Sequence, residues 1–178
     1  MVSLDPTRRL ADVAFAGCPA RLVAPVGPAW SAALATGAAL LASEQLGVAQ
    51  WCLDTTVEYL KTRYQFGRPI GSFQGLKHRL AELWVVLTQA RAVARYAAGC
   101  LADGDPDLRV AVALAQAHCA PVAVRAAEEC VQMHGGIGFT WEYPAHLYLK
   151  RAKADAIALG TAERHRAALA GLVDLPPA

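Results

Sequence analysis

The placement of glycine and proline constrains the fold of this 178-residue chain more than any other feature. Beyond residue 28 they mostly gather in short clusters, and the segments between the clusters are long. These segments repeat apolar residues at three- and four-residue spacing, the pattern of a helix with one buried face. Three of them are roughly thirty residues long and are joined by short connections, so neighbours must run antiparallel. The sequence therefore predicts an all-α fold, an antiparallel helical bundle.

The breakers also set the expected ends of the helices. The predicted helices are residues 29–63, 74–102, 107–134, 145–158 and 161–172. Gly67, Pro69 and Gly71 end the first of them within a few residues. Pro121 has no backbone N–H and should kink the third helix. Thr161 is placed to cap the last one.

One face of each long helix is predicted to form the core. On the first helix this face comprises Leu34, Leu41, Val48, Leu53, Val57 and Leu60. On the second it comprises Leu76, Leu80, Leu83, Val86 and Leu87. Trp84 is expected to add a further packing ring to the second helix.

The first 27 residues have a different pattern. "LADVAFAG" alternates apolar and polar positions, and "CPARLVAPVGP" combines three prolines with a strand-like trio. This predicts one or two short strands, the remnant of a preceding sheet. We therefore divide the chain into a β remnant, residues 1–27, and a helical domain, residues 28–178.

Composition excludes several classes of protein. Apolar residues make up 55% of the chain and charged residues 18%, so some apolar surface is expected to meet a partner. A formal charge of +2 without a basic cluster argues against nucleic acid. No segment has the ~20 uninterrupted apolar residues of a membrane span, so no membrane insertion is expected. Five scattered cysteines indicate neither a disulfide framework nor a metal site, and they suit the reducing cytoplasm.

Two connections carry residues suited to cofactor binding. In "RYQFGRPI", Arg63 and Arg68 flank an aromatic ring and a glycine, a combination that can pair with phosphate and stack on a flat heterocycle. In "QMHGGIGFTWEYP", Gly135, Gly136 and Gly138 free the backbone to approach a cofactor edge. This stretch follows a helix and is therefore no dinucleotide fingerprint, which follows a strand. Both connections could equally be plain turns between helices.

Two longer segments carry a family resemblance. "RYQFGRPIGSFQGLKHRLAELW" and "CVQMHGGIGFTWEYPAHLYLKRA" stand in the order and separation seen in the carboxyl-terminal helical domain of flavin-dependent acyl-CoA dehydrogenases, and the likeness runs from about residue 4 to the end. The chain resembles this family. The resemblance implies a homo- or hetero-oligomer with another subunit of the same family, FAD shared across a subunit interface, and acyl-CoA as substrate. Family members place further domains before this bundle, so the chain looks like a part of a larger protein.

The resemblance also implies roles for individual residues. The neighbouring subunit's FAD would be contacted by Arg63, Phe66, Gln74, Gln132, Gly135 and Gly136. Thr161 matches a residue that the family turns toward its own subunit's flavin. The aromatic residues Phe139, Trp141 and Tyr143 are expected to close the bundle.

The chain departs from the family at the catalytic base, the glutamate that removes the proton α to the thioester. Leu159 occupies the common base position, and the Thr36/Gly37 region occupies the alternative one. Ala38 stands where an arginine often shapes the acyl-CoA end. None of these side chains accepts a proton, so no catalytic residue is predicted.

Other titratable residues were weighed as substitutes. Glu44 lies further along the first helix, but a structural role is favoured for it. His134 precedes the glycines, and a lone histidine is more often packed than catalytic. Glu58, Glu82 and Asp155 resemble solvated helix charges.

Three functions follow from this sequence. The first is the carboxyl-terminal domain or short subunit of an acyl-CoA dehydrogenase acting on a fatty-acid or steroid side chain, non-catalytic and completing a partner's FAD site, as in the heteromeric actinobacterial type that lacks the catalytic glutamate. The second is a truncated catalytic subunit with an unrecognised base. The third is a helical oligomerisation module without a cofactor role.

Overall fold

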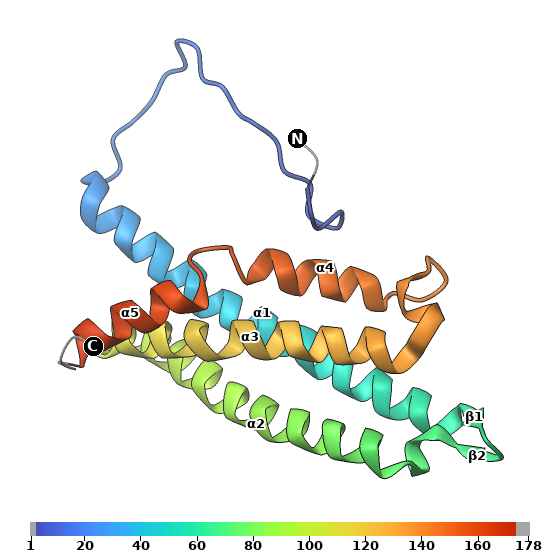
Figure 1. Ribbon diagram of the computed structural model, residues 1–178. Helices are drawn as coiled ribbons and strands as arrows, with labels where there is room; N and C mark the ends of the chain where they lie inside the picture. The colour runs from blue at the N-terminus through green and yellow to red at the C-terminus, as the bar shows by residue number, and fades with distance from the viewer. Residues whose placement is uncertain (1–2, 174–178) are drawn as a thin grey trace.

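The computed structural model describes residues 3–173 and shows the predicted helical bundle (Figure 1). Its helices are α1 (Val26–Thr62), α2 (Gln74–Asp103), α3 (Leu108–His134), α4 (Ala145–Asp155) and α5 (Ala162–Leu172). A small hairpin of β1 (Tyr64–Gln65) and β2 (Arg68–Pro69) follows α1, and 3-10 turns η1 (Ile70–Ser72) and η2 (Gly135–Phe139) follow the hairpin and α3. The predicted all-α fold is therefore confirmed.

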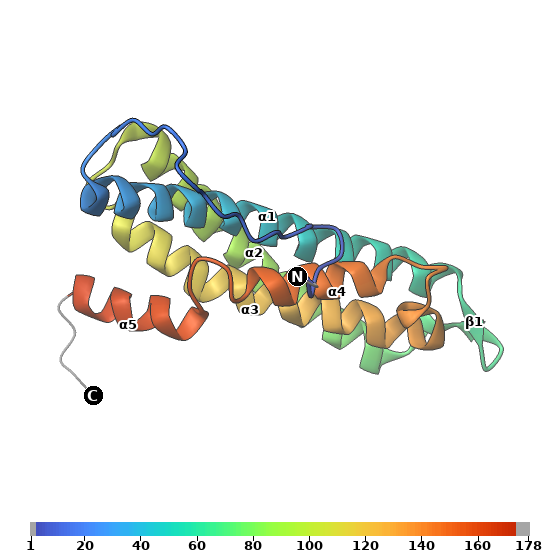
Figure 2. The same cartoon turned by 90° about the horizontal axis from the view of Figure 1, so that it is seen from above.

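Helix α3 is the centre of the bundle and packs against each of the other four helices. The long helices α1, α2 and α3 lie alongside one another, α4 covers α1 and α3, and α5 lies near the end where α2 meets α3 (Figures 1 and 2). The buried face of α3 consists mostly of alanine and cysteine. Small side chains let helix axes approach closely, so the core is filled by closely spaced helices rather than by large side chains.

Two connections depend on glycine. Gly71 lies under α1, where an added Cβ would come within 2.9 Å of the Leu60 carbonyl oxygen. Gly104 ends α2 in the left-handed conformation, with φ of 64°. Both glycines lie in the connections that follow α1 and α2. These two helices end within one residue of the predicted boundaries.

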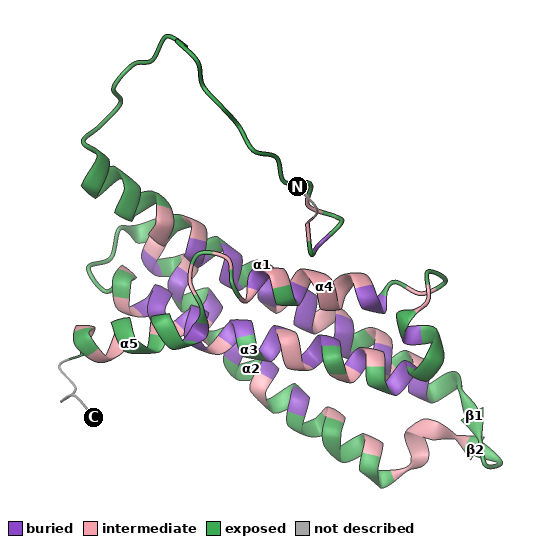
Figure 3. Cartoon of the chain, turned by 45° about the horizontal axis from the view of Figure 1, so that its top comes forward, coloured by how far each residue is buried: buried purple, intermediate pink, exposed green. Residues whose placement is uncertain are grey.

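The strands predicted in residues 1–27 are absent from the described part of that segment, residues 3–25, and this prediction is wrong. Every residue from 9 to 25 is exposed, and the segment arches away from the bundle (Figures 1 and 3). A strand needs a neighbouring edge to satisfy its N–H and C=O groups, and an exposed segment has none. The division at residue 27 stays a prediction, and residues 1–2 and 174–178 lie outside the described part.

Several side chains and boundaries also differ from expectation. Trp84 is 59% exposed and is no packing ring of the core. Helix α1 begins at Val26, before the predicted start, and α4 ends at Asp155 instead of residue 158. Helix α3 runs without interruption through Pro121. The hydrophobic faces of α1 and α2 still contribute Leu41 and Leu83 to the core, as periodicity predicts.

Two helical runs are long and apolar enough, by length and composition, to cross a membrane. They are α1 and the run from Leu108 to Phe139. In the most apolar 18-residue stretch of the second run, 67% of the residues are buried inside the bundle. In the corresponding stretch of α1, 39% are buried. The sequence prediction counted only uninterrupted apolar runs and missed both. In α3 the apolar residues serve core packing.

Candidate cofactor interface

The hairpin presents an aromatic ring to solvent in a strained conformation. Its two-residue turn, Phe66 and Gly67, has φ of 54° and 74°, and positive φ at both positions is the geometry that tight hairpins require. A phenylalanine rarely adopts positive φ, and here the ring is 91% exposed, so little burial offsets the strain. Strained residues concentrate at functional sites, and an exposed ring at a hairpin tip is available to stack on a ligand.

Two exposed polar residues lie in the chain before and after the hairpin. Arg63 caps the end of α1: its N–H donates to the Tyr59 oxygen over 2.9 Å and its own carbonyl accepts from Ile70 over 2.8 Å. Its guanidinium is exposed and forms no ion pair within residues 3–173. Gln74 begins α2 and is also exposed. The backbone of Arg63 is therefore fixed while its charge is free for a ligand.

The glycines of the second connection, η2, differ in what surrounds them: one is required by packing and another faces open space. A Cβ on Gly138 would lie 2.6 Å from the Val131 carbonyl oxygen, so the fold itself requires glycine there. A Cβ on Gly136 would meet nothing within 4 Å, and its φ is not positive. Gly135 has φ of 63° and also open space around it. Neither backbone conformation nor packing among the described residues requires glycine at position 136, so this part of the turn is open to another molecule.

The hairpin and the glycine turn lie toward the same end of the bundle (Figures 1 and 2). Tyr59 in the last turn of α1 stacks on His134 in the last turn of α3, with ring centroids 4.3 Å apart. Gln132 is exposed and lies in the last turn of α3, three residues before Gly135. The six residues assigned to a neighbour's FAD therefore share one end of the molecule, and exposed arginine, aromatic, amide and glycine positions fit a flat, phosphate-bearing cofactor.

Thr161 lies elsewhere, at the start of α5 and away from the hairpin (Figure 1). Its hydroxyl accepts a hydrogen bond from the Arg164 N–H at 3.4 Å, which is the predicted helix cap. The expected role of Thr161, toward a different flavin from the one expected at the hairpin, stays a prediction.

Leu159 and the Thr36/Gly37 region, where the family resemblance implies a catalytic base, lie side by side. A Cβ on Gly37 in α1 would be 3.0 Å from Leu159 Cδ1, so the Leu159 side chain covers that glycine. Leu159 itself has a strained φ of 58° and lies before Gly160. Its carbonyl oxygen lies 3.1 Å from His165 Nε2. The structure brings both base positions together and places no carboxylate on either.

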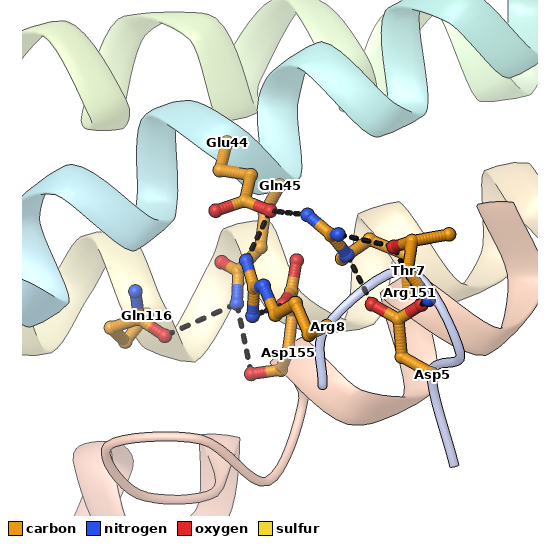
Figure 4. A network of polar contacts seen from close by, with 8 residues as sticks. All are labelled: Asp5, Thr7, Arg8, Glu44, Gln45, Gln116, Arg151 and Asp155. Carbon is orange, nitrogen blue, oxygen red and sulfur yellow. Dashed lines mark hydrogen bonds and ion pairs between the residues drawn. The ribbon is translucent and has the colours of Figure 1, made fainter. Parts of the chain in front are cut away.

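Glu44 belongs to a polar network and is not a free base (Figure 4). Its carboxylate is shared by the guanidinium groups of Arg8 and Arg151. Both charge-assisted contacts would have to be broken before this carboxylate could serve another partner. The favoured structural reading of Glu44 is consistent with this arrangement.

Asp155 was misread as a solvated charge: it is 0% exposed. Arg8 Nη1 donates to Asp155 Oδ1 over 2.7 Å, and Asp155 Oδ2 has no hydrogen-bond partner among the described residues. Burial, followed by the neighbouring Glu44 carboxylate, raises the pKa of Asp155 to about 6, against the attraction of Arg8 and Arg151. The sequence could not reveal this environment, because it depends on the tertiary structure and the partner Arg8 lies 147 residues away in the chain. Glu58 and Glu82 are exposed as expected.

Asp155→Asn is expected to change how stability depends on pH. Since the folded-state pKa of Asp155 is raised above its ordinary 3.8 to about 6, the folded protein binds this proton more tightly between those values. The contribution of Asp155 to the free energy of unfolding therefore falls by about 3 kcal/mol as pH rises through that window. Urea unfolding from about pH 4 to pH 7 should show this fall in the wild type and its loss in Asp155→Asn.

Exposed Asp12 supplies the matched control for this measurement. Asp12→Asn should retain the wild-type profile. Asp5 acts in the opposite direction at lower pH: burial raises its pKa, but hydrogen bonds from Thr7 and Arg151 outweigh burial and hold the pKa below its usual range. Identical slopes in wild type and Asp155→Asn would show that Asp155 is not the titrating group.

His134 is a packed histidine. It is 3% exposed, and its ring lies between those of Tyr59 and Tyr143, at centroid distances of 4.3 and 4.5 Å. Nδ1 lies 2.7 Å from the Cys130 carbonyl oxygen and donates to it, which leaves Nε2 without a partner among the described residues. Burial lowers the pKa of His134, but its hydrogen bonds with Cys130 outweigh burial and raise it overall. No substrate can reach this ring.

The aromatic residues after the glycines divide into two kinds. Tyr143 is half-buried and its hydroxyl lies 2.6 Å from Thr55 Oγ1, so it closes the bundle as expected. Phe139 and Trp141 are 67% and 78% exposed, and the same expectation is wrong for them. Trp141 contacts α4 through His146, with ring centroids 4.6 Å apart, but this contact leaves most of the residue in solvent.

The fold and these connections correspond to a known class of protein. Residues 28–172 match the acyl-CoA dehydrogenase C-terminal domain. The chain belongs to the acyl-CoA dehydrogenase family.

Individual relatives agree. Acyl-CoA dehydrogenase IpdE2 of Mycobacterium tuberculosis is 46% identical over 160 residues, which cover 88% of this chain and 45% of that protein. The structure of butyryl-CoA dehydrogenase from Megasphaera elsdenii has a TM-score of 0.78 and 33% identity, over 83% of this chain and 39% of that one. The ChsE4–ChsE5 complex from Mycobacterium tuberculosis has a TM-score of 0.76 and 33% identity, over 84% and 40%. The chain spans less than half the length of these relatives.

Proposed function

We propose that this chain is a non-catalytic part of an FAD-dependent acyl-CoA dehydrogenase and completes the FAD site of a partner subunit of the same family. Arg63 and Phe66 of the hairpin, Gln74, Gln132 and the glycine turn would hold the partner's cofactor. Thr161 would face a second flavin. The assembly is a homo- or hetero-oligomer in the cytoplasm, and its substrate is an acyl-CoA thioester with a fatty-acid or steroid side chain.

The open space at Gly136 is the observation that carries this proposal. The fold tolerates a side chain at this position, and the neighbouring Phe66 accepts strain while it stays exposed. Packing among the described residues requires neither glycine at position 136 nor an exposed phenylalanine at position 66, and a cofactor approaching this end would account for both. When bound, FAD would supply the hydride acceptor for oxidation of the acyl chain.

The absence of a base supports the non-catalytic part of the proposal. Removal of the α proton needs a carboxylate beside the acyl chain, and Leu159 fills the space over Gly37. Glu44 is paired with two arginines. Asp155 is buried within the network and bound by Arg8, so it cannot reach a substrate in this arrangement.

Flavin binding by the chain alone and in a complex tests the proposal. The purified chain should retain no FAD after desalting and should oxidise no acyl-CoA in the presence of an electron acceptor. Co-expression with acyl-CoA dehydrogenase subunits from its own genome should yield a complex with bound flavin absorbance. Stoichiometric FAD on the isolated chain, or acyl-CoA oxidation by it, would contradict the proposal.

A further inference from the structure

A short turn, residues 5–8, docks the N-terminal segment on the bundle. The Asp5 carboxylate accepts hydrogen bonds from the Thr7 N–H at 2.9 Å and from the Thr7 hydroxyl at 2.7 Å. Asp5 is 1% exposed, whereas residues 9–25 are all exposed. The Arg8 N–H donates to the Asp5 carbonyl at 3.2 Å, which closes the turn and directs the Arg8 side chain toward the helices.

Arg8 links three separate parts of the chain (Figure 4). One guanidinium nitrogen donates to Glu44 on α1, and the other donates to Asp155 at the last position of α4 over 2.7 Å. Arg151 on α4 binds both Glu44 and Asp5 and reinforces the same contact. The N-terminal turn is therefore joined to α1 and to the end of α4 by charge-assisted hydrogen bonds.

The end of α4 is also tied to the base positions through two buried glutamines. Gln45 Nε2 donates to the Asp155 carbonyl and to Gln116 Oε1, both at 3.3 Å. Gln116 Nε2 donates to the Ala38 carbonyl at 2.7 Å. Ala38 follows Gly37, the residue that Leu159 covers. The loop after Asp155 and the facing turn of α1 are thus held through one continuous set of contacts.

We propose that Arg8 is a positioning residue for the loop of residues 156–161, which carries Leu159 and Thr161. Asp155 is fully buried at the start of this loop, and a buried carboxylate that loses its cation is strongly disfavoured. Without Arg8, Asp155 must either take up a proton or be solvated by movement of the end of α4, and in both cases the ion pair that anchors the start of the loop is lost. The link to the flavin rests on the proposed function, through Thr161, whereas the position of the loop does not.

The other hydrogen bonds of this loop are short-range. The N–H groups of Ala156, Ile157 and Ala158 donate to carbonyls of residues 152 and 154 at 3.0–3.3 Å, and the Leu159 and Thr161 carbonyls lie 3.1 and 3.0 Å from His165 nitrogens. Leu159 adopts positive φ, which local preference disfavours. The conformation of the loop therefore depends on tertiary contacts, and Arg8 holds its first anchor.

Hydrogen exchange of the purified chain tests this inference, with Arg8→Gln compared with Arg9→Gln. Arg9 is the adjacent, exposed arginine and forms no ion pair with any described residue, so it is a matched control. Arg8→Gln should raise amide exchange in residues 156–161 by about tenfold or more and leave residues 111–127 of α3 unchanged. Arg9→Gln should change neither region, and Arg8→Lys should restore part of the protection because it keeps the charge.

Two outcomes would overturn the inference. Unchanged exchange in residues 156–161 would show that Arg8 does not position the loop. An equal rise in residues 111–127 would show that Arg8 serves only global stability. The measurement needs neither flavin nor a partner, so its result can be interpreted even if the proposed function is wrong.

Discussion

Replacing Arg63 by alanine is expected to lower the affinity of the assembled complex for FAD by roughly 10- to 100-fold. The guanidinium is exposed and forms no ion pair among the described residues, so it contributes little to the fold. A charge-assisted hydrogen bond to a phosphate is worth about 1.5–3 kcal/mol, which corresponds to that loss of affinity. Flavin retained by the co-expressed complex after dialysis, and FAD titration of the stripped complex, measure the effect.

Arg109→Ala is the matched control for this experiment. Arg109 is also exposed and lies at the start of α3, at the opposite end of the bundle from the hairpin. It should leave flavin affinity unchanged, and both variants should unfold within about 0.5 kcal/mol of the wild type. If Arg63→Ala retains full FAD affinity in a complex that does bind flavin, the hairpin has no cofactor role, and the chain is an oligomerisation module as in the third hypothesis.

Substituting the two glycines of η2 is expected to separate folding from binding. Gly138→Ala should lower the free energy of unfolding by about 2–3 kcal/mol, because the new methyl group would press against the Val131 backbone oxygen at 2.6 Å. Gly136→Ala should change stability by less than about 0.5 kcal/mol, because its Cβ meets nothing within 4 Å. Denaturant unfolding of both variants measures the contrast.

The same pair should behave differently in the complex. Gly136→Ala should weaken FAD binding although the chain remains fully folded, since a methyl group would stand between the turn and an approaching cofactor. A Gly136→Ala complex with wild-type flavin content would remove the observation on which the proposed cofactor interface rests. Equal destabilisation by both substitutions would show that the turn packs differently from the structure described above.

The sequence alone predicted the helices and their connections well, because both depend on local properties. Breakers such as Gly67 and Gly104, both at positive φ, act within their own turn of chain, and apolar periodicity shows which face of a helix will be buried. The boundary of α2 at Gln74 and the cap at Thr161 were predicted correctly for this reason. The residues of the cofactor interface came from the family resemblance, and the geometry then showed which of them share one end of the bundle.

Only the tertiary structure decided what depends on contacts between distant segments. Asp155, an expected surface charge, is buried in the folded chain, and the turn that carries Arg8 supplies its ion-pair partner. The fold also brings Leu159 over Gly37, 122 residues apart in the chain, so that both base positions form one apolar contact. The local sequence pattern determines which secondary structure a segment prefers. The burial of a side chain, its ion pairs and its pKa depend instead on which distant segments come together in the fold.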